Sequence, residues 1–347
     1  MKNLKDIIIE QLHINKDIES NYYNYQPKTR DKLIKIVDQL IKKRGNNADL
    51  NDIDTSEITD MSRLFYKYKF NGDISNWNVS NVTDMKYMFA HSKFNGDISN
   101  WDVSNVKDMY SMFEGSNFNG DISNWDVSNV EDIRYMFSKS KFNGDISNWN
   151  VSNVKNMNCM FSESSFNGDI SNWDVSNVKT MESMFYDSKF NGDISEWDVS
   201  NVEYMMSMFN SSKFNRDISK WNVSNVKDMR YMFYVSLFNG DISEWDVSNV
   251  KNMNCMFSES SFNGDISNWD VSNVEDMTYM FAYSEITREN VDLSNWDVSN
   301  VKYMRGMFYR SNFNGDISNW DVSNVEDMEG IFLQSPLQKN PPKWYKD

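Results

Sequence analysis

A tryptophan recurs every 24 residues along most of this 347-residue chain, and this fixed interval constrains the fold more than any other feature. One copy of the repeat reads WDVSNVKDMYSMFEGSNFNGDISN, from Trp101 to Asn124. A single longer step of 27 residues, from Trp269 to Trp296, carries the irregular text SEITRENVDLSNW. A period of this size is typical of stacked repeats, in which each unit buries its apolar side only against its neighbours. The repeat tryptophans are Trp77, Trp101, Trp125, Trp149, Trp173, Trp197, Trp221, Trp245, Trp269, Trp296 and Trp320.

Apolar spacing within one repeat predicts its local structure. Trp101 and Val103 are two residues apart, which places them on one face of a strand. From Val106 to Phe113 the apolar residues follow at intervals of three and four, which indicates one face of a short helix. Asn119-Gly120 is a turn signal that returns the chain to the next strand. We therefore expect an α/β repeat solenoid: a stack of eleven 24-residue strand-plus-short-helix repeats with a parallel sheet.

The segments at both ends of the repeats differ from them. Apolar residues Leu33 to Ile41 have helical spacing and Gly45 follows as a stop, while a weaker helical pattern runs from Leu4 to Leu12. We predict three parts. Residues 1–48 form a helical N-terminal cap, and residues 49–335 form the repeat solenoid, with a degenerate first repeat at 49–70 and an irregular repeat at 282–296. Residues 336–347 form a C-terminal cap.

The repeat text W-D-V-S-N-V-x-x-M-x-x-M-F resembles the BspA-like leucine-rich-repeat surface proteins, a bacterial family. Residues 50–335 carry the resemblance, and Ile98, Trp101 and Val103 match the L-x-x-L-x-L strand signature of that family. The resemblance implies a leucine-rich-repeat-like solenoid, display at the cell surface, and a role in adhesion or host contact.

Composition excludes several classes of function. A net charge of −16 disfavours nucleic acid and anionic membranes as partners, because both need basic patches. The chain has only two histidines, His13 and His91, and no glycine-rich nucleotide-binding motif. We therefore expect a non-catalytic protein that needs no cofactor.

Localisation stays open in the sequence. No run of about 18 apolar residues is present, so we expect no membrane insertion. The start, MKNLKDIIIEQLHINKD, does not have the pattern of a secretion signal, because its apolar run is short and acidic residues flank it. These features favour a cytoplasmic location, whereas the resemblance implies the cell surface.

The two cysteines, Cys159 and Cys255, lie in almost identical text four repeats apart. Strand spacing would separate them by about 19 Å. A disulfide needs Cα atoms within about 7 Å, so no intramolecular bridge is expected.

Two further columns of residues have alternative interpretations. The tryptophans could grip sugars, but their flanking Ile and Val residues favour a place in the core. The aspartates that precede each strand would repel one another in register. Each could accept main-chain N–H groups of its own turn, or the column could bind divalent cations such as Ca²⁺. The candidates for the cation column are Asp97, Asp121, Asp145, Asp169 and Asp193.

The positions that change from repeat to repeat fall on the outward side of the V-x-x-M-x-x-M-F segment. Tyr and Arg recur there, and both are favoured at protein interfaces. We predict that this convex, helix-side face of a monomer binds a protein partner. The alternatives are a passive spacer, in which these positions merely drift, and a uniform polar sheet face that binds a glycan or cations. The candidate residues are Tyr87, Tyr110, Arg134, Tyr135, Arg230, Tyr231, Tyr279, Arg288 and Arg305.

Overall fold

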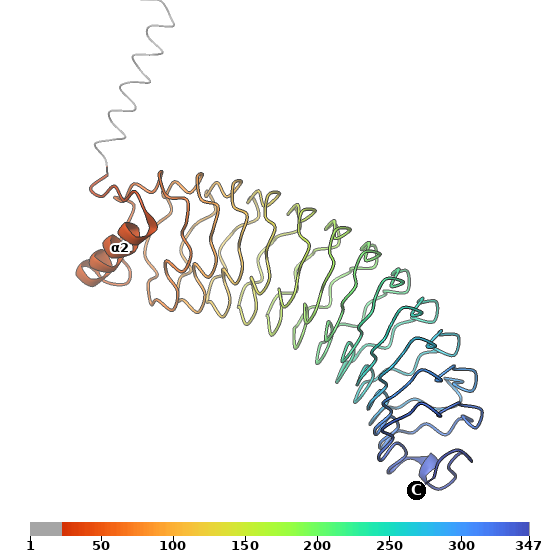
Figure 1. Ribbon diagram of the computed structural model, residues 1–347. Helices are drawn as coiled ribbons and strands as arrows, with labels where there is room; N and C mark the ends of the chain where they lie inside the picture. The colour runs from red at the N-terminus through yellow and green to blue at the C-terminus, as the bar shows by residue number, and fades with distance from the viewer. Residues whose placement is uncertain (1–22, 347) are drawn as a thin grey trace, which may run out of the picture.

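The chain winds into an arc of stacked layers, each formed by one repeat (Figure 1). The structure is a computed structural model, and it describes residues 23–346. Over these residues it contains one α-helix, α2 (Arg30–Arg44), and one 3₁₀ helix, η1 (Pro336–Gln338). Turns and isolated parallel β-bridges between successive layers make up the rest. The weaker helix expected at Leu4 to Leu12 lies outside the described residues.

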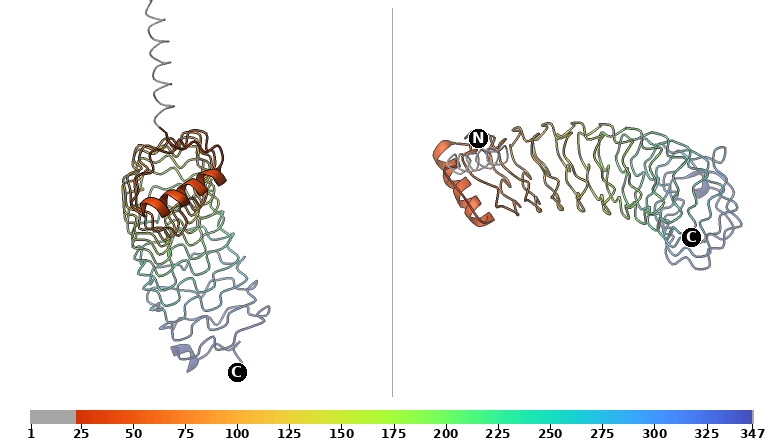
Figure 2. Two further views of the ribbon diagram at one scale, coloured as in Figure 1. Left: turned by 90° about the vertical axis from the view of Figure 1, so that its left-hand side faces the viewer. Right: turned by 90° about the horizontal axis from the view of Figure 1, so that it is seen from above.

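Helix α2 lies across the first layer at one end of the stack (Figure 2). Its apolar stripe, Leu33, Val37 and Leu40, is buried in the same core as the repeats. Asp31 in the first turn and basic residues in the last turn suit the helix dipole. Gly45, with φ of 91°, ends the helix. The helix thus covers apolar surface that the first layer would otherwise expose.

The predicted short helix from Val106 to Phe113 is wrong, because these residues form linked β-turns. Within one layer, the N–H groups of Val106, Met112 and Ser116 donate to carbonyls three residues earlier, at 2.9, 3.1 and 3.2 Å. A β-turn brings its first and fourth residues together, so it gives the same three-residue apolar spacing as a helix. The spacing identified the inward side chains correctly and the backbone incorrectly.

Left-handed residues prevent a helix in this segment. Ser111 has φ of 52° and Gly115 of 59°, and the equivalent residues of the other layers also have positive φ. Each occupies the third position of a β-turn, where positive φ is the mark of a type II turn. Among residues 23–346, twenty-one non-glycine residues adopt this conformation. A run of right-handed residues long enough for a helix therefore never forms.

The predicted parallel sheet of a leucine-rich-repeat solenoid is also wrong. Met109, Ser111 and Phe113 donate their N–H groups to carbonyls of the next layer at 2.9, 2.9 and 3.0 Å. The residues between them direct their N–H groups into turns of their own layer, so a continuous ladder cannot form. What remains is a series of isolated parallel bridges, such as Asp84 to Asp108 and Asp108 to Asp132. We call residues 108–115 and their equivalents the bridged segment of each layer.

Stacked aromatic rings fill the core. Phe113 stacks on Phe137 of the next layer at 5.7 Å between centroids, and Phe118 stacks on Phe142 at 6.2 Å. The repeat tryptophans are 3–4% exposed, which confirms their predicted place in the core. Each indole N–H donates to a main-chain carbonyl of the preceding layer, as Trp125 does to Ile98 at 3.1 Å. Main-chain carbonyls, and not Asn or Ser side chains, thus accept these indole N–H groups.

The Asn-Gly pair that most repeats carry is a point of stacking rather than a turn. The N–H of Asn119 donates to the side-chain oxygen of Asn95 in the preceding layer at 2.7 Å. Successive layers repeat this bond, which forms an asparagine ladder. A Cβ on Gly120 would lie 2.9 Å from the ring of Phe118, so the glycine makes room for that ring.

Layer spacing explains the curvature. Main-chain bridges hold the bridged segments at about 4.8 Å. The Phe113–Phe137 spacing is 5.7 Å, and across the core Phe118–Phe142 and Trp221–Trp245 are 6.2 and 6.4 Å apart. On that wider side, side-chain contacts such as the asparagine ladder and the indole N–H bonds join the layers, together with main-chain bonds such as Asn117 to Ser92 at 3.3 Å. A stack curves toward the side on which its layers are closest, so we expect the bridged segments to line the inner side of the arc that Figure 1 shows. The variable residues were predicted on a convex, helix-side face; the segment that carries them contains no helix.

Candidate functional site

The aspartate column is satisfied within each layer. Oδ1 of Asp97 accepts the main-chain N–H and the hydroxyl of Ser99 at 2.9 and 2.7 Å, and Asp121 does the same with Ser123. Asp145, Asp169 and Asp193 accept the main-chain N–H two residues on, at 2.9 to 3.0 Å. These contacts are Asx-turns, the first of the two interpretations of the column that the sequence allowed. They lower the pKa of all five carboxyl groups, chiefly through the main-chain hydrogen bond.

Within residues 23–346, no group of three or more His, Cys, Asp or Glu side chains is arranged to hold a metal ion. Cation binding along the aspartate column stays a prediction that the geometry does not test.

The Asx-turn carboxylates should make stability depend on acid pH. Their folded pKa values are lowered, so their contribution to stability is present above the unfolded pKa of about 4 and is lost as pH falls through the folded values. Among the carboxyl groups of residues 23–346, only Asp108 and Glu182 have raised pKa values, due first to burial, and these two act in the opposite sense. We expect the thermal midpoint to be level from about pH 5 to pH 7 and to fall below about pH 4.

Asparagine provides the control for that experiment. Asn78 and Asn150 directly follow the repeat tryptophans of their layers, and each accepts the main-chain N–H two residues on, as the aspartates do. Asparagine therefore fits an Asx-turn of this fold. Replacing Asp97, Asp121 and Asp145 together by Asn should keep the fold at pH 7 and weaken the acid dependence of the midpoint. An unchanged acid dependence would show that other groups cause it.

Four tyrosines form a continuous track along the bridged segments of the first layers. Tyr66 contacts Tyr87 at 6.2 Å between ring centroids, Tyr87 contacts Tyr110 at 5.1 Å, and Tyr110 contacts Tyr135 at 5.6 Å. We call these four residues the tyrosine track. Their side chains are half-buried, so one side of each remains available. The structure thus joins three of the predicted residues, and Tyr66 extends them into the degenerate first repeat.

Cations cover the rings of the track. The guanidinium of Arg63 lies 4.2 Å from the ring centroid of Tyr87 and 5.2 Å from that of Tyr66. Arg134 lies 5.1 Å from the centroid of Tyr110 and pairs with Asp132 at 2.6 Å. Such cation–π contacts each contribute about 0.5–1 kcal/mol at exposed sites and hold both groups in place.

Two interactions further fix the track. Lys86 lies between Asp84 and Asp108, at 3.5 and 3.0 Å, and these carboxylates raise the pKa of the lysine. A side-chain hydrogen bond with Cys159 raises the pKa of Tyr135 to about 12, so that hydroxyl stays protonated at neutral pH. Tyr135 therefore presents a neutral hydroxyl to a partner, and the ion pairs beside the track are fixed within the layers.

The remaining predicted residues form smaller groups further along. Arg230 makes a bidentate pair with Asp228, beside Tyr231. Near the C-terminal end, Arg305 donates to the hydroxyl of Tyr279 at 3.3 Å, and the two line a hollow of about 280 Å³. A Cβ on Gly306 would lie 2.2 Å from the Tyr279 ring, so this glycine lets the ring lie flat on the next layer.

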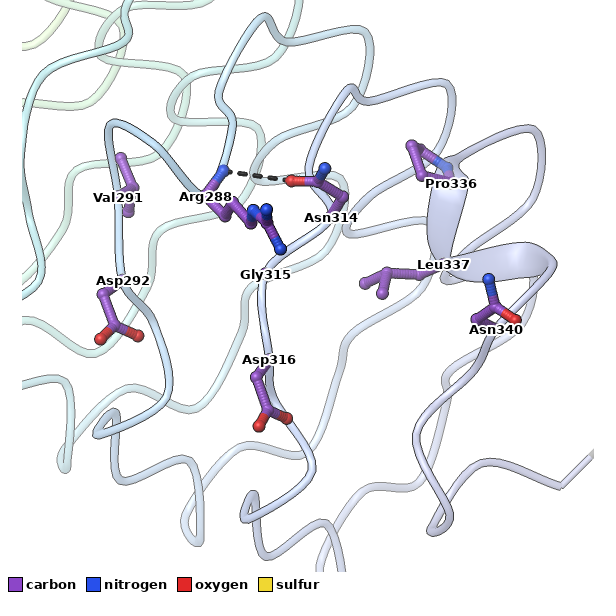
Figure 3. Close-up of a pocket in the computed structure, with 9 residues that line it drawn as sticks. All are labelled: Arg288, Val291, Asp292, Asn314, Gly315, Asp316, Pro336, Leu337 and Asn340. Atoms are coloured by element: carbon purple, nitrogen blue, oxygen red, sulfur yellow. Dashed lines mark hydrogen bonds between the residues drawn. The ribbon is translucent and has the colours of Figure 1, made fainter.

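Arg288 does not join these groups. It lines a separate hollow of about 660 Å³ with Asp292 and Asp316 (Figure 3). These two aspartates belong to the aspartate column and lie in successive layers. Its main-chain N–H donates to Asn314 at 3.3 Å, and its side chain lies 3.5 Å from Glu289. The irregular segment thus shapes a different face from the one that carries the tyrosines.

Both cysteines are free, as expected from their spacing. Cys159 and Cys255 occupy left-handed turn positions, with φ of 57° and 53°. Burial raises the pKa of both thiols, that of Cys255 to about 11, so neither is a reactive thiolate at neutral pH.

Sequence reasoning missed Tyr66, Arg63 and Lys67, which lie in the first repeat. That repeat has no tryptophan, but its MSRLFYKYKF text aligns with MYSMFEGSNF of the Trp101 repeat. Aligning the Met-x-x-Leu/Met-Phe core would have placed Arg63 and Tyr66 at variable positions.

Among residues 23–346, no helix is long and apolar enough to cross a membrane.

One family model matches the chain, and its description is "Mycoplasma protein of unknown function, DUF285". It matches residues 35–141, 94–189, 116–213, 166–259 and 235–344, so each match spans about four repeats. The resemblance to BspA-like proteins thus stays a sequence-based hypothesis, and the leucine-rich-repeat fold expected from it is wrong for the reasons above. No curated protein and no solved structure matches the chain.

Proposed function

Since the chain belongs to the family described as "Mycoplasma protein of unknown function, DUF285", whose description gives no activity, we propose from the surface that it is a non-catalytic binding protein. Its partner is a protein, which docks on the concave bridged segments at the tyrosine track. Adhesion to another cell is one setting for such binding.

The tyrosine track is the observation that carries this proposal. Four contiguous tyrosines with two arginines on their faces provide the residue types that dominate binding energy at protein interfaces. Tyrosine has few rotatable bonds and the track is already packed, so little conformational entropy is lost on docking. A concave surface also allows a partner to contact several layers at once.

The experiment replaces three track residues by residues that other layers use at the same positions. Ser111, Ser183 and Ser207 occupy the position of Tyr87 and Tyr135, and Asn158 occupies that of Tyr110. We expect the variant Tyr87→Ser/Tyr110→Asn/Tyr135→Ser to keep its thermal midpoint within a few degrees. Its affinity for a protein captured from cells or lysate should fall at least about tenfold, since hot-spot residues each contribute about 2 kcal/mol.

A matched control removes tyrosines outside the track. Tyr204 and Tyr303 are 40% and 42% exposed, and Thr180 occupies their position in another layer. The variant Tyr204→Thr/Tyr303→Thr should bind the captured protein as the unaltered chain does. Equal binding by all three proteins would contradict the track as the docking surface, and would favour a spacer or another face.

A further inference from the structure

The first layer carries two cations that, unlike most cations of the bridged segments, pair with no carboxylate among the described residues. Arg63 and Lys67 are both exposed, and the ammonium of Lys67 lies 5.0 Å from the ring centroid of Tyr66. Tyr66 is therefore contacted by both cations, while Arg63 also lies over Tyr87. Among the described residues, neither cation has a carboxylate within ion-pair distance.

Elsewhere on the bridged segments, most cations are neutralised by carboxylates of this chain. Arg310 is an exception: it lies 5.3 and 5.5 Å from the ring centroids of Tyr283 and Tyr309, but its Nε already donates to Gln334 at 2.5 Å. The ion pairs are Lys86–Asp108 at 3.0 Å, Arg134–Asp132 at 2.6 Å, Lys139–Glu163 at 3.3 Å, Arg230–Asp228 at 2.6 Å and Arg305–Glu329 at 2.7 Å.

The charge distribution along the chain also distinguishes the N-terminal end from the rest of the stack. Residues 23–69 hold ten Lys and Arg against seven Asp and Glu, whereas the whole chain has a net charge of −16. An anionic group is therefore repelled by most of the stack and attracted to its N-terminal end. Charge asymmetry of this kind steers a partner to one place and one orientation.

We propose that Arg63 and Lys67 bind a carboxylate of an acidic protein segment, with Tyr66 and Tyr87 packing against the apolar part of that segment. The inference rests on the proposed function and names the chemistry of its partner. Arg63 can present a planar pair of donors to a carboxylate. Because the tyrosine rings already hold both cations, docking a carboxylate costs little further side-chain entropy.

The test uses the full chain and a fluorescein-labelled hexaglutamate peptide, with hexaserine as the neutral probe. We expect hexaglutamate to raise its fluorescence anisotropy on binding, and high salt to weaken that binding. Arg63→Gln/Lys67→Gln should reduce the affinity at least about tenfold, because it removes both positive charges and their charge-assisted hydrogen bonds to the carboxylate.

The control variant is Lys139→Gln/Lys227→Gln, which also removes two positive charges but from lysines already paired with glutamates at 3.3 and 2.6 Å. It should change the affinity less than about twofold, since paired surface charges contribute little. No binding of hexaglutamate, equal losses in both variants, or tighter binding of a single-stranded oligonucleotide would overturn the proposal. If the tyrosine variant loses the captured partner and Arg63→Gln/Lys67→Gln keeps it, the acidic partner is wrong and the proposed function stands.

Discussion

Replacing Phe161 by Ala is expected to lower the free energy of unfolding by about 3–5 kcal/mol. Phe161 is fully buried and stacks on Phe137 and Phe185 of the adjacent layers at 5.8 and 5.9 Å. It also stacks on Phe166 of its own layer at 4.3 Å. The stack is joined only through neighbouring layers, so a cavity at one layer weakens both of its interfaces. Equilibrium unfolding in guanidinium, followed by tryptophan fluorescence, measures the change.

Leu237→Ala is the matched control for Phe161→Ala. Leu237 is 57% exposed, so its truncation should change the free energy of unfolding by less than about 0.5 kcal/mol. A loss below about 1 kcal/mol for Phe161→Ala would mean that the phenylalanine ladder does not hold the layers together.

Replacing Ser207 by Pro is expected to lower the free energy of unfolding by about 3 kcal/mol or more. Ser207 has φ of 57°, which proline cannot adopt, and its N–H donates to Arg230 of the next layer at 2.8 Å. Ser207→Gly should instead raise stability by about 0.5–1 kcal/mol, because glycine adopts positive φ without steric cost. Thermal or guanidinium unfolding measures both changes.

The sign of the glycine effect separates the observed turns from the helix expected at this position. Glycine within a helix costs about 0.5–1 kcal/mol relative to alanine. Ser207→Ala keeps the N–H and is expected to change little, so it serves as the reference. Destabilisation by Ser207→Gly relative to Ser207→Ala would contradict the left-handed turn. Gly306 and Gly330 already occupy the equivalent position in the last layers, with φ of 55° and 64°.

Much of the core could be predicted from the sequence. The inward positions of Trp101, Val103, Met109, Met112 and Phe113 follow from the repeat, and all five are buried. A helix in the N-terminal cap followed from the Leu33–Ile41 spacing, and α2 spans Arg30–Arg44. These features depend on which side chains avoid water, and the spacing of apolar residues in a single sequence shows that preference.

The site was predicted in part. Variable positions of the repeat gave Tyr87, Tyr110 and Tyr135, which the structure brings into contact. Arg63 and Lys67 were missed, because the first repeat lacks the tryptophan that set the register. The paired state of Arg134 and the unpaired state of Arg63 depend on the position of Asp132 and on neighbours in other layers, which spacing along the chain does not give.

The sequence by itself determined the 24-residue period, the buried side chains and the stacking of layers. Only the tertiary structure decided the backbone that joins them. Apolar residues three apart suit a helix and a β-turn equally well, and an isolated repeat would not hold residues such as Ser111 at positive φ. Hydrogen bonds from Met109, Ser111 and Phe113 to the next layer stabilise that conformation. The backbone conformation thus depends on contacts with a neighbouring layer, so the sequence of one repeat does not distinguish β-turns from a helix.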